Sequence, residues 1–145
     1  VKRMAGSMRH TMLKNEQRVQ LIEQAQQARQ QAYAPYSNYR VGAALLTSTG
    51  DVFSGANVEN AAYPTSMCAE RVAIFKAVSE GQQQFQAIAV VTENGGSPCG
   101  SCRQVLAEFG LETLVLIADA KGRVVQEMTV AELLPGAFRP ADLGK

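Results

Sequence analysis

Three cysteines are the residues whose type and spacing could do chemistry in this chain. Cys99 and Cys102 form a C-x-x-C pair within S-P-C-G-S-C-R-Q-V-L at 97–106, and Cys68 stands earlier. A C-x-x-C pair at the start of a helix can be a redox dithiol, because the helix dipole lowers the pKa of its thiols. It can also supply two ligands of a zinc site. Since a free cysteine can also be a small buried hydrophobic residue, three interpretations stand side by side.

Only the metal interpretation uses all three cysteines. A redox dithiol does not need Cys68, whereas Zn²⁺ favours four-coordinate sites with thiolate ligands. A closed structural site would need a fourth Cys or His, and the single histidine, His10, lies in the N-terminal segment. Three protein ligands with an open fourth position are typical of catalytic zinc, which lowers the pKa of a bound water to about 7. The residues therefore favour a catalytic zinc centre.

Glu70, two residues after Cys68, is the candidate proton carrier beside this centre. Taken alone, it would be explained as an acid that stabilises the first turn of a helix. It cannot complete a capping box, because position 67 is Met67 rather than Ser or Thr. Next to an activated water, an acid that transfers protons is the better account.

The charge of such a centre calls for nearby cations. Three thiolates and a hydroxide around Zn²⁺ sum to about −2, which weakens the metal as a Lewis acid unless positive groups lie close. Arg71 directly follows Glu70, and Arg103 directly follows Cys102. Taken alone, Arg103 is expected to be a solvated surface residue.

The hydrophobic pattern predicts the elements that must position these residues. Pro35 is expected to end the first helix. The last two strands are joined by the turn A-K-G, which suits an antiparallel hairpin. The order α-β-β-α-β-α-β-β-α predicts an α/β domain with one mixed sheet of about five strands covered by helices. The predicted helices are 15–34, 66–80, 99–109 and 130–134, and the strands are 41–47, 51–58, 85–92, 113–119 and 123–128.

Two predicted helix beginnings carry the cysteines. Thr65 or Ser66 is expected to cap the helix 66–80, which places Cys68 in its first turn. Cys99 and Cys102 fall in the first turn of the next helix. Because both helices follow strands, we expect their N-termini to converge at one end of the sheet.

Composition limits the class of protein. The chain has 145 residues, of which 46% are hydrophobic and 19% charged, with a formal net charge of +1. This balance gives no field that would attract nucleic acid or an anionic membrane, and no apolar run approaches the roughly 18 residues of a membrane span. The odd cysteine number and the lack of a secretory signal predict a cytoplasmic location without a disulfide framework. We expect residues 1–13 to be a tail, in part an expression remnant, and 14–145 to be one domain.

The pattern C-A-E at 68–70 followed by P-C-x-x-C at 98–102 is similar to the zinc-deaminase signature in its three-cysteine form. The chain resembles the cytidine deaminases, specifically the small homotetrameric class, over about residues 15 to 140. The resemblance implies a cytidine deaminase-like fold with helices on both faces of the sheet. Further stretches that carry it are A-P-Y-S-N-Y-R-V-G-A-A-L at 34–45, N-V-E-N-A-A-Y-P at 57–64 and L-L-P-G-A-F at 133–138.

The activity that the resemblance implies is zinc-dependent hydrolytic deamination of cytidine and 2′-deoxycytidine to uridine and 2′-deoxyuridine plus ammonia, a step of pyrimidine salvage. One Zn²⁺ per chain would be bound by the three cysteines. Glu70 would take a proton from the water, protonate N3 of cytosine and deliver a proton to the departing ammonia. Arg71 would hydrogen-bond the zinc thiolates and offset their charge.

The resemblance also implies the substrate contacts. Asn57 and Glu59 would hold a ribose hydroxyl. Active sites would be shared between the subunits of a homotetramer, with a tyrosine near the 5′ end of the ribose and a C-terminal phenylalanine against the base. Tyr39 stands where the family commonly has Phe, and its hydroxyl needs a partner if it is buried. Tyr63 matches the position of the tyrosine near the 5′ end and Phe138 that of the C-terminal phenylalanine, and the remaining implied contacts are Ala61 and Ala69.

Two alternatives remain open at this point. A blasticidin-type deaminase, which acts on a cytosine-bearing antibiotic, shares the C-A-E and P-C-x-x-C motifs, although N-V-E-N-A favours the ordinary nucleoside. A non-catalytic zinc-stabilised or thiol-redox protein would use the same cysteines. Deaminases that edit nucleic acid would need a basic binding surface and usually a histidine ligand.

Overall fold

The described part of the chain, residues 13–145 of a computed structural model, is built around one five-stranded sheet. Its strands are β1 (Gly42–Thr47), β2 (Val52–Ala56), β3 (Phe85–Val91), β4 (Leu114–Ala118) and β5 (Val124–Thr129). Its helices are α2 (Asn15–Arg29), α3 (Ala69–Ser79), α4 (Gly100–Phe109) and α5 (Val130–Leu133), with 3₁₀ turns η1 (Tyr63–Thr65) and η2 (Pro140–Leu143). The strand order is β2-β1-β3-β4-β5, with β3 and β4 parallel and every other neighbouring pair antiparallel.

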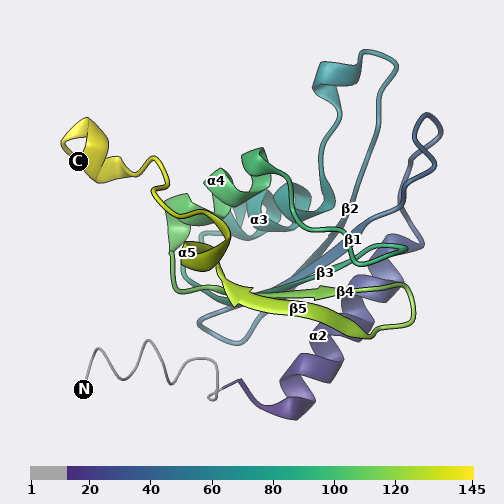
Figure 1. The fold of residues 1–145 in the computed structure, drawn as a ribbon, viewed down its shortest axis with the longest axis horizontal. Coiled ribbons are helices and arrows are strands. Elements are labelled where there is room, and N and C mark those ends of the chain that lie inside the picture. The colour runs from purple at the N-terminus through teal and green to yellow at the C-terminus, as the bar shows by residue number, and fades with distance from the viewer. Residues whose placement is uncertain (1–12) are drawn as a thin grey trace.

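Side chains that alternate along the strands build a hydrophobic core on each face of the sheet. On one face, Leu45, Ile88 and Ile117 pack beneath α3, α4 and α5. On the other face, Leu46 and Leu116 pack against α2. Figure 1 shows α2 on one side of the sheet and the other three helices opposite it. The predicted mixed sheet, the helices on both faces and the antiparallel last hairpin are therefore confirmed.

The first helix is shorter than predicted. α2 ends at Arg29, whereas the pattern predicted a helix to residue 34, ended by Pro35. Tyr33 instead pairs with the chain beyond β2. Its N–H donates to the Asn57 carbonyl at 2.9 Å, and its carbonyl accepts from the Glu59 N–H at 2.8 Å. The prediction was wrong because this long-range pairing holds the backbone extended before the proline is reached.

The helix that carries the first cysteine begins later than predicted. Thr65 and Ser66 were the expected caps, but the N-cap of α3 is Cys68. The residue before it, Met67, pairs with Val58 in an antiparallel bridge, with N–H donors 2.9 and 3.0 Å from the carbonyl oxygens. The backbone therefore stays extended up to the cysteine, and the thiol lies at the very start of the helix.

α3 lies close to β2 at Gly55. A Cβ on Gly55 would lie 2.6 Å from the Ala69 carbonyl oxygen and 2.7 Å from the Ala73 nitrogen. Both distances are under the 3.0 Å that real Cβ atoms keep. Only glycine permits this approach, which fixes the first turn of α3, with Cys68 and Glu70, against the sheet.

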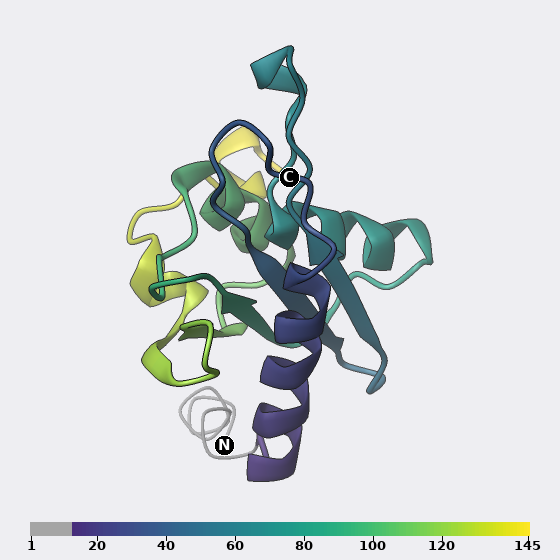
Figure 2. The ribbon, with the colours of Figure 1, turned by 90° about the vertical axis from the view of Figure 1, so that its right-hand side faces the viewer.

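The segment between β2 and α3 reaches away from the body of the domain. Figures 1 and 2 show it as a long arm with η1 at its tip. The side chain of Tyr63, in η1, is 62% exposed. The arm returns to the body at Met67, directly before the first cysteine.

The predicted boundary between the tail 1–13 and the domain 14–145 lies at the start of the described residues. Leu13, counted with the predicted tail, is buried in the core that covers the α2 face of the sheet. The rest of that tail, residues 1–12, lies outside the described residues. Within residues 13–145, none of the helices has the length and apolar character needed to cross a membrane.

Candidate functional site

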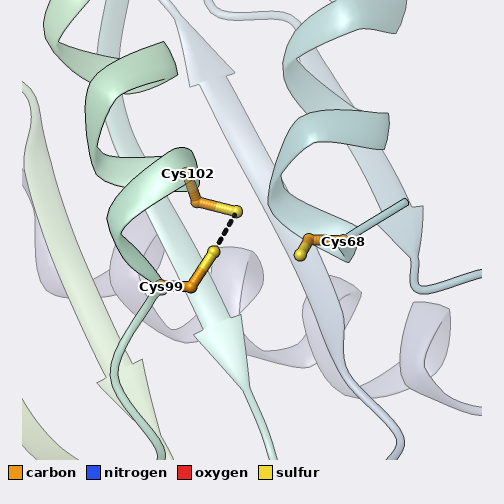
Figure 3. A group of neighbouring side chains, drawn as sticks. All are labelled: Cys68, Cys99 and Cys102. Carbon is orange, nitrogen blue, oxygen red and sulfur yellow. Dashed lines mark hydrogen bonds between the residues drawn. The ribbon is translucent and has the colours of Figure 1, made fainter. Parts of the chain in front are cut away.

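The three cysteines converge at the N-termini of two helices. Cys68 is the N-cap of α3, Cys99 is the N-cap of α4, and Cys102 lies in the first turn of α4. Their sulfur atoms all lie within 4.8 Å of one another, and the Cys99 thiol donates to the Cys102 sulfur at 3.6 Å. Figure 3 shows the three side chains pointing toward a common centre. The predicted convergence of the two helix N-termini is confirmed.

The closeness of the sulfurs governs their ionisation. Hydrogen bonds from Cys102 and Arg71 lower the pKa of Cys68 to about 5, although burial opposes the change. The pKa of Cys102 is raised by its hydrogen bond to Cys68 and by burial. The protein's own groups thus favour ionisation of Cys68 over that of Cys102, and a cation bound between the sulfurs would favour ionisation of Cys102 as well. Because soft thiolates select Zn²⁺ over hard cations, the cluster fits one zinc per chain.

Arg71 supplies positive charge to this cluster. Its Nη2 donates to the Cys68 sulfur at 3.2 Å, and this bond raises the pKa of the guanidinium. Its Nε is buried and has no hydrogen-bond partner among residues 13–145. The guanidinium therefore stays charged beside the sulfurs and retains one further donor.

Glu70 is buried in the first turn of α3, next to the cysteines. The residue is 5% exposed and lines the same cavity as Cys68 and Cys99. Burial raises the pKa of its carboxyl to about 7, against a backbone hydrogen bond that lowers it. A carboxyl with this pKa can both accept and release a proton near neutral pH.

Cys68, Cys99 and Glu70 line a cavity of about 570 Å³. That volume is within the roughly 300–1,000 Å³ of pockets that bind small molecules. Two of the predicted substrate residues, Ala61 and Phe138, are not part of its lining. The predicted substrate residues that line it are Tyr39, Asn57, Glu59, Tyr63 and Ala69.

The side chain of Asn57, which lines the cavity, hydrogen-bonds the backbone of the segment before β1. Its Nδ2 donates to the Tyr39 carbonyl at 2.8 Å, and its Oδ1 accepts from the Val41 N–H at 2.9 Å. Both bonds fix the chain that leads into β1. The side chain thus has a structural role that the sequence did not reveal.

Glu59 is engaged by the same segment. Its Oε1 accepts from the N–H groups of Tyr36 and Ser37 at 3.0 and 3.1 Å, and its Oε2 accepts from the Ser37 hydroxyl. These bonds hold the pKa of Glu59 below its usual value. Since a carboxylate can accept about four hydrogen bonds, one more donor can still be bound.

Several cavity residues were missed by the sequence analysis. Ser37 lay within the quoted stretch A-P-Y-S-N-Y-R, but nothing in the pattern indicated its bonds to Glu59. The loop after β3 had only one signal, its place directly before the C-x-x-C pair. Its cavity-lining residues are Thr92, Gly96 and Ser97.

Arg103 is not the solvated surface residue that was expected, and that prediction was wrong. Its Nε donates to the Pro98 carbonyl at 2.8 Å, and its Nη1 donates to the Leu133 carbonyl at 2.7 Å. Its Nη2 donates to the Ser97 hydroxyl at 2.9 Å. Arg103 therefore ties the chain before Cys99 to the end of α5.

The match with known proteins covers this whole site. A family model described as the cytidine and deoxycytidylate deaminase zinc-binding region matches residues 15–118, which include all three cysteines and Glu70. The chain belongs to this family. A cytidine deaminase from Sporosarcina psychrophila is 52% identical over 126 residues, which are 85% of this chain and 92% of the relative.

A solved structure shares the fold of this family member. The cytidine deaminase from Burkholderia pseudomallei has a TM-score of 0.78 and 49% identity, covering 82% of this chain and 97% of that one. A blasticidin-S deaminase from Bacillus cereus is more distant, at 32% identity over 131 residues, 83% of this chain and 91% of the relative. The Sporosarcina and Burkholderia cytidine deaminases are thus more similar to this chain than that antibiotic deaminase.

Proposed function

We propose that the protein deaminates cytidine and 2′-deoxycytidine by zinc-dependent hydrolysis, giving uridine and 2′-deoxyuridine plus ammonia in pyrimidine salvage. The observation that carries the proposal is the placement of Glu70 beside the three-cysteine cluster in one cavity. The likeness to the Sporosarcina cytidine deaminase supports the choice of substrate.

The chemical roles follow from this placement. A zinc ion held by the three cysteines would supply a water activated as a nucleophile for C4 of cytosine. Glu70 takes a proton from that water and gives it to N3 of the base, then takes the proton of the hydroxyl newly bonded to C4 and gives it to the amino group that leaves as ammonia. Its pKa of about 7 supports this exchange, since a group near the working pH moves protons in both directions. Arg71 offsets the charge of the thiolates through its bond to Cys68.

Substrate binding is proposed to use the remaining lining of the cavity. Glu59 is assigned to a ribose hydroxyl, because its carboxylate accepts three hydrogen bonds from the chain and can accept one more. Asn57 is assigned to the same sugar, next to the segment that it holds. Tyr39 and Ala69 line the cavity and are assigned to the nucleoside.

Assembly into a homotetramer would complete the site. Tyr63 and Phe138 are 62% and 57% exposed, which leaves both residues able to reach a neighbouring subunit. Phe138 is also held in place, since its N–H and carbonyl bond to the Gln104 amide at 3.1 and 3.0 Å. Ala61, on the protruding arm, is assigned to the same shared site. We place the protein in the cytoplasm, where a reducing environment keeps the three thiols free.

The proposal is tested by a substrate panel combined with metal analysis. Purified protein is assayed for loss of cytosine absorbance with cytidine, 2′-deoxycytidine and blasticidin S side by side, and its zinc content is measured. We expect turnover of both nucleosides and about one zinc per chain. Turnover of the antibiotic alone would replace the substrate assignment, and reversible disulfide cycling of Cys99 and Cys102 without zinc or turnover would replace the whole proposal.

A further inference from the structure

The hydroxyl of Tyr39 joins two walls of the cavity. It donates to Asn94 Oδ1 at 2.9 Å, which bonds the segment before β1 to the loop 92–97 after β3. The half-buried Tyr39 itself lines the cavity, as do Thr92 and Gly96 of that loop. The loop then runs directly into Cys99. The hydroxyl of Tyr39 thus connects this cavity residue to the loop 92–97.

The loop has its own bonds, and they meet at the same acceptor. The Gly96 N–H donates to the Thr92 hydroxyl at 2.7 Å, and that hydroxyl donates to Asn94 Oδ1 at 3.5 Å. Thr92 is 3% exposed and therefore anchors the loop to the end of β3. Asn94 Oδ1 receives both this bond and the bond from Tyr39, so the loop and the phenol form one network.

The Tyr39 hydroxyl packs closely against Gly96. A Cβ on Gly96 would lie 2.3 Å from the Tyr39 hydroxyl oxygen, a distance that real Cβ atoms do not show. The next neighbours, Tyr39 Cζ at 3.5 Å and Asn94 Oδ1 at 3.7 Å, are at ordinary contact distance. The backbone of Gly96 lies outside the positive-φ region. A side chain at position 96 would therefore have to displace the Tyr39 hydroxyl.

We propose that Tyr39 is a positioning residue for the nucleoside, whose hydroxyl, bonded to Asn94 and seated against Gly96, holds the loop 92–97 as a fixed wall of the cavity. The proposal rests on the proposed function, because the nucleoside is the ligand that the wall would contact. It predicts an effect on substrate binding rather than on the chemical step, since the network includes neither Glu70 nor the cysteines.

Removing either end of the bond should weaken binding. For Tyr39→Phe and for Asn94→Ala we expect KM for cytidine to rise about 2- to 10-fold, the range of one ordinary hydrogen bond, with kcat within about 2-fold. Glu93→Ala is the matched control, because Glu93 is exposed, adjacent to Asn94 and outside the cavity lining. An unchanged KM in both variants, or a loss confined to kcat, would overturn the proposal.

The contact with Gly96 gives a sharper test. Gly96→Ala in the wild-type background forces the hydroxyl away, so we expect KM to rise about 5-fold or more. In the Tyr39→Phe background the same change meets only ordinary contacts, so it should alter KM by less than about 2-fold. An equal cost of Gly96→Ala in both backgrounds would show that the hydroxyl is not the cause.

A readout without turnover separates this proposal from the proposed function. Amide hydrogen exchange in 94–97 should accelerate about 2- to 10-fold in Tyr39→Phe and in Asn94→Ala but not in Glu93→Ala. If the wild-type protein did not deaminate nucleosides, this result would still support the network while the proposed function failed. If the wild-type protein were active and exchange did not respond to either variant, the network alone would be refuted.

Discussion

Arg71 donates a hydrogen bond from Nη2 to the sulfur of Cys68, 3.2 Å away. Cys68 is the N-cap of α3, so the helix that begins at the sulfur also carries the cation that compensates its charge. Together with a hydrogen bond from Cys102, which has the larger effect, the bond lowers the pKa of the thiol, and it raises the pKa of the guanidinium. Three thiolates around one dication leave a net charge of about −1, and Arg71 is placed to balance it.

Replacing this cation should weaken metal binding. For Arg71→Gln we expect zinc affinity to fall about 10- to 100-fold, because the thiolates lose a hydrogen bond and a compensating charge. Competition with a chromophoric chelator measures the change. Lys76→Gln, which removes a cation at the other end of α3, is the control and should bind zinc as the wild type does. Equal affinity in Arg71→Gln would mean that the pairing does not stabilise the centre.

The close approach at Gly55 should limit substitution there. In Gly55→Ala the new Cβ would lie 2.6 Å from the Ala69 carbonyl oxygen, so α3 must move off β2. We expect the free energy of unfolding, measured with urea, to fall by about 1–3 kcal/mol. At Gly100 a Cβ meets no atom within 4 Å, so Gly100→Ala should change stability by less than about 0.5 kcal/mol. Similar losses in both variants would contradict the packing account.

The bonds to Glu59 should make stability depend on acid pH. The Ser37 hydroxyl is the main cause that holds the pKa of Glu59 below its usual value of about 4.5. A depressed native pKa stabilises the fold fully above the unfolded value, and the contribution is lost as pH falls through the native pKa.

Ser37→Ala removes that hydroxyl and so tests whether the stabilisation by Glu59 is lost as pH falls. We expect the stability gap between wild type and Ser37→Ala, from urea denaturation, to be complete at neutral pH and to shrink below about pH 4.5. Ser79→Ala is the control. The hydroxyl that it removes donates to a backbone carbonyl, so the difference in stability between wild type and Ser79→Ala should not vary with pH. A Ser37→Ala gap that is constant or widens in acid would be the opposite result.

Local patterns in the sequence were sufficient to predict the sheet and its layers. Continuous apolar runs indicated β3 and β4. Because successive side chains of a strand point to opposite faces, the adjacent residues Leu45 and Leu46 pack in the cores on opposite faces of the sheet. The convergence of Cys68 with the C-x-x-C pair was predicted too, because the N-termini of helices that follow strands of one sheet can meet at one end of that sheet.

Long-range backbone pairing explains what could not be predicted. The end of α2 and the start of α3 both depend on the chain around Val58, which pairs with Tyr33 on one side and Met67 on the other. Neither partner is marked by local propensity. Arg103 was misjudged for a similar reason, since its acceptor at Leu133 is far away in the sequence. Side-chain networks such as Tyr39 with Asn94 likewise join segments that only the fold brings together.

The role of Glu70 is the central claim, and one variant tests it most directly. Glu70→Gln keeps the size of the buried side chain but cannot accept the proton of the attacking water. Zinc content, unfolding and cytidine turnover are measured together, with Glu80→Gln, an exposed acid at the C-terminal end of the same helix, as the control. We expect Glu70→Gln to keep about one zinc per chain and its fold while losing at least about 100-fold in kcat, and Glu80→Gln to match the wild type. Full turnover by Glu70→Gln would contradict the account.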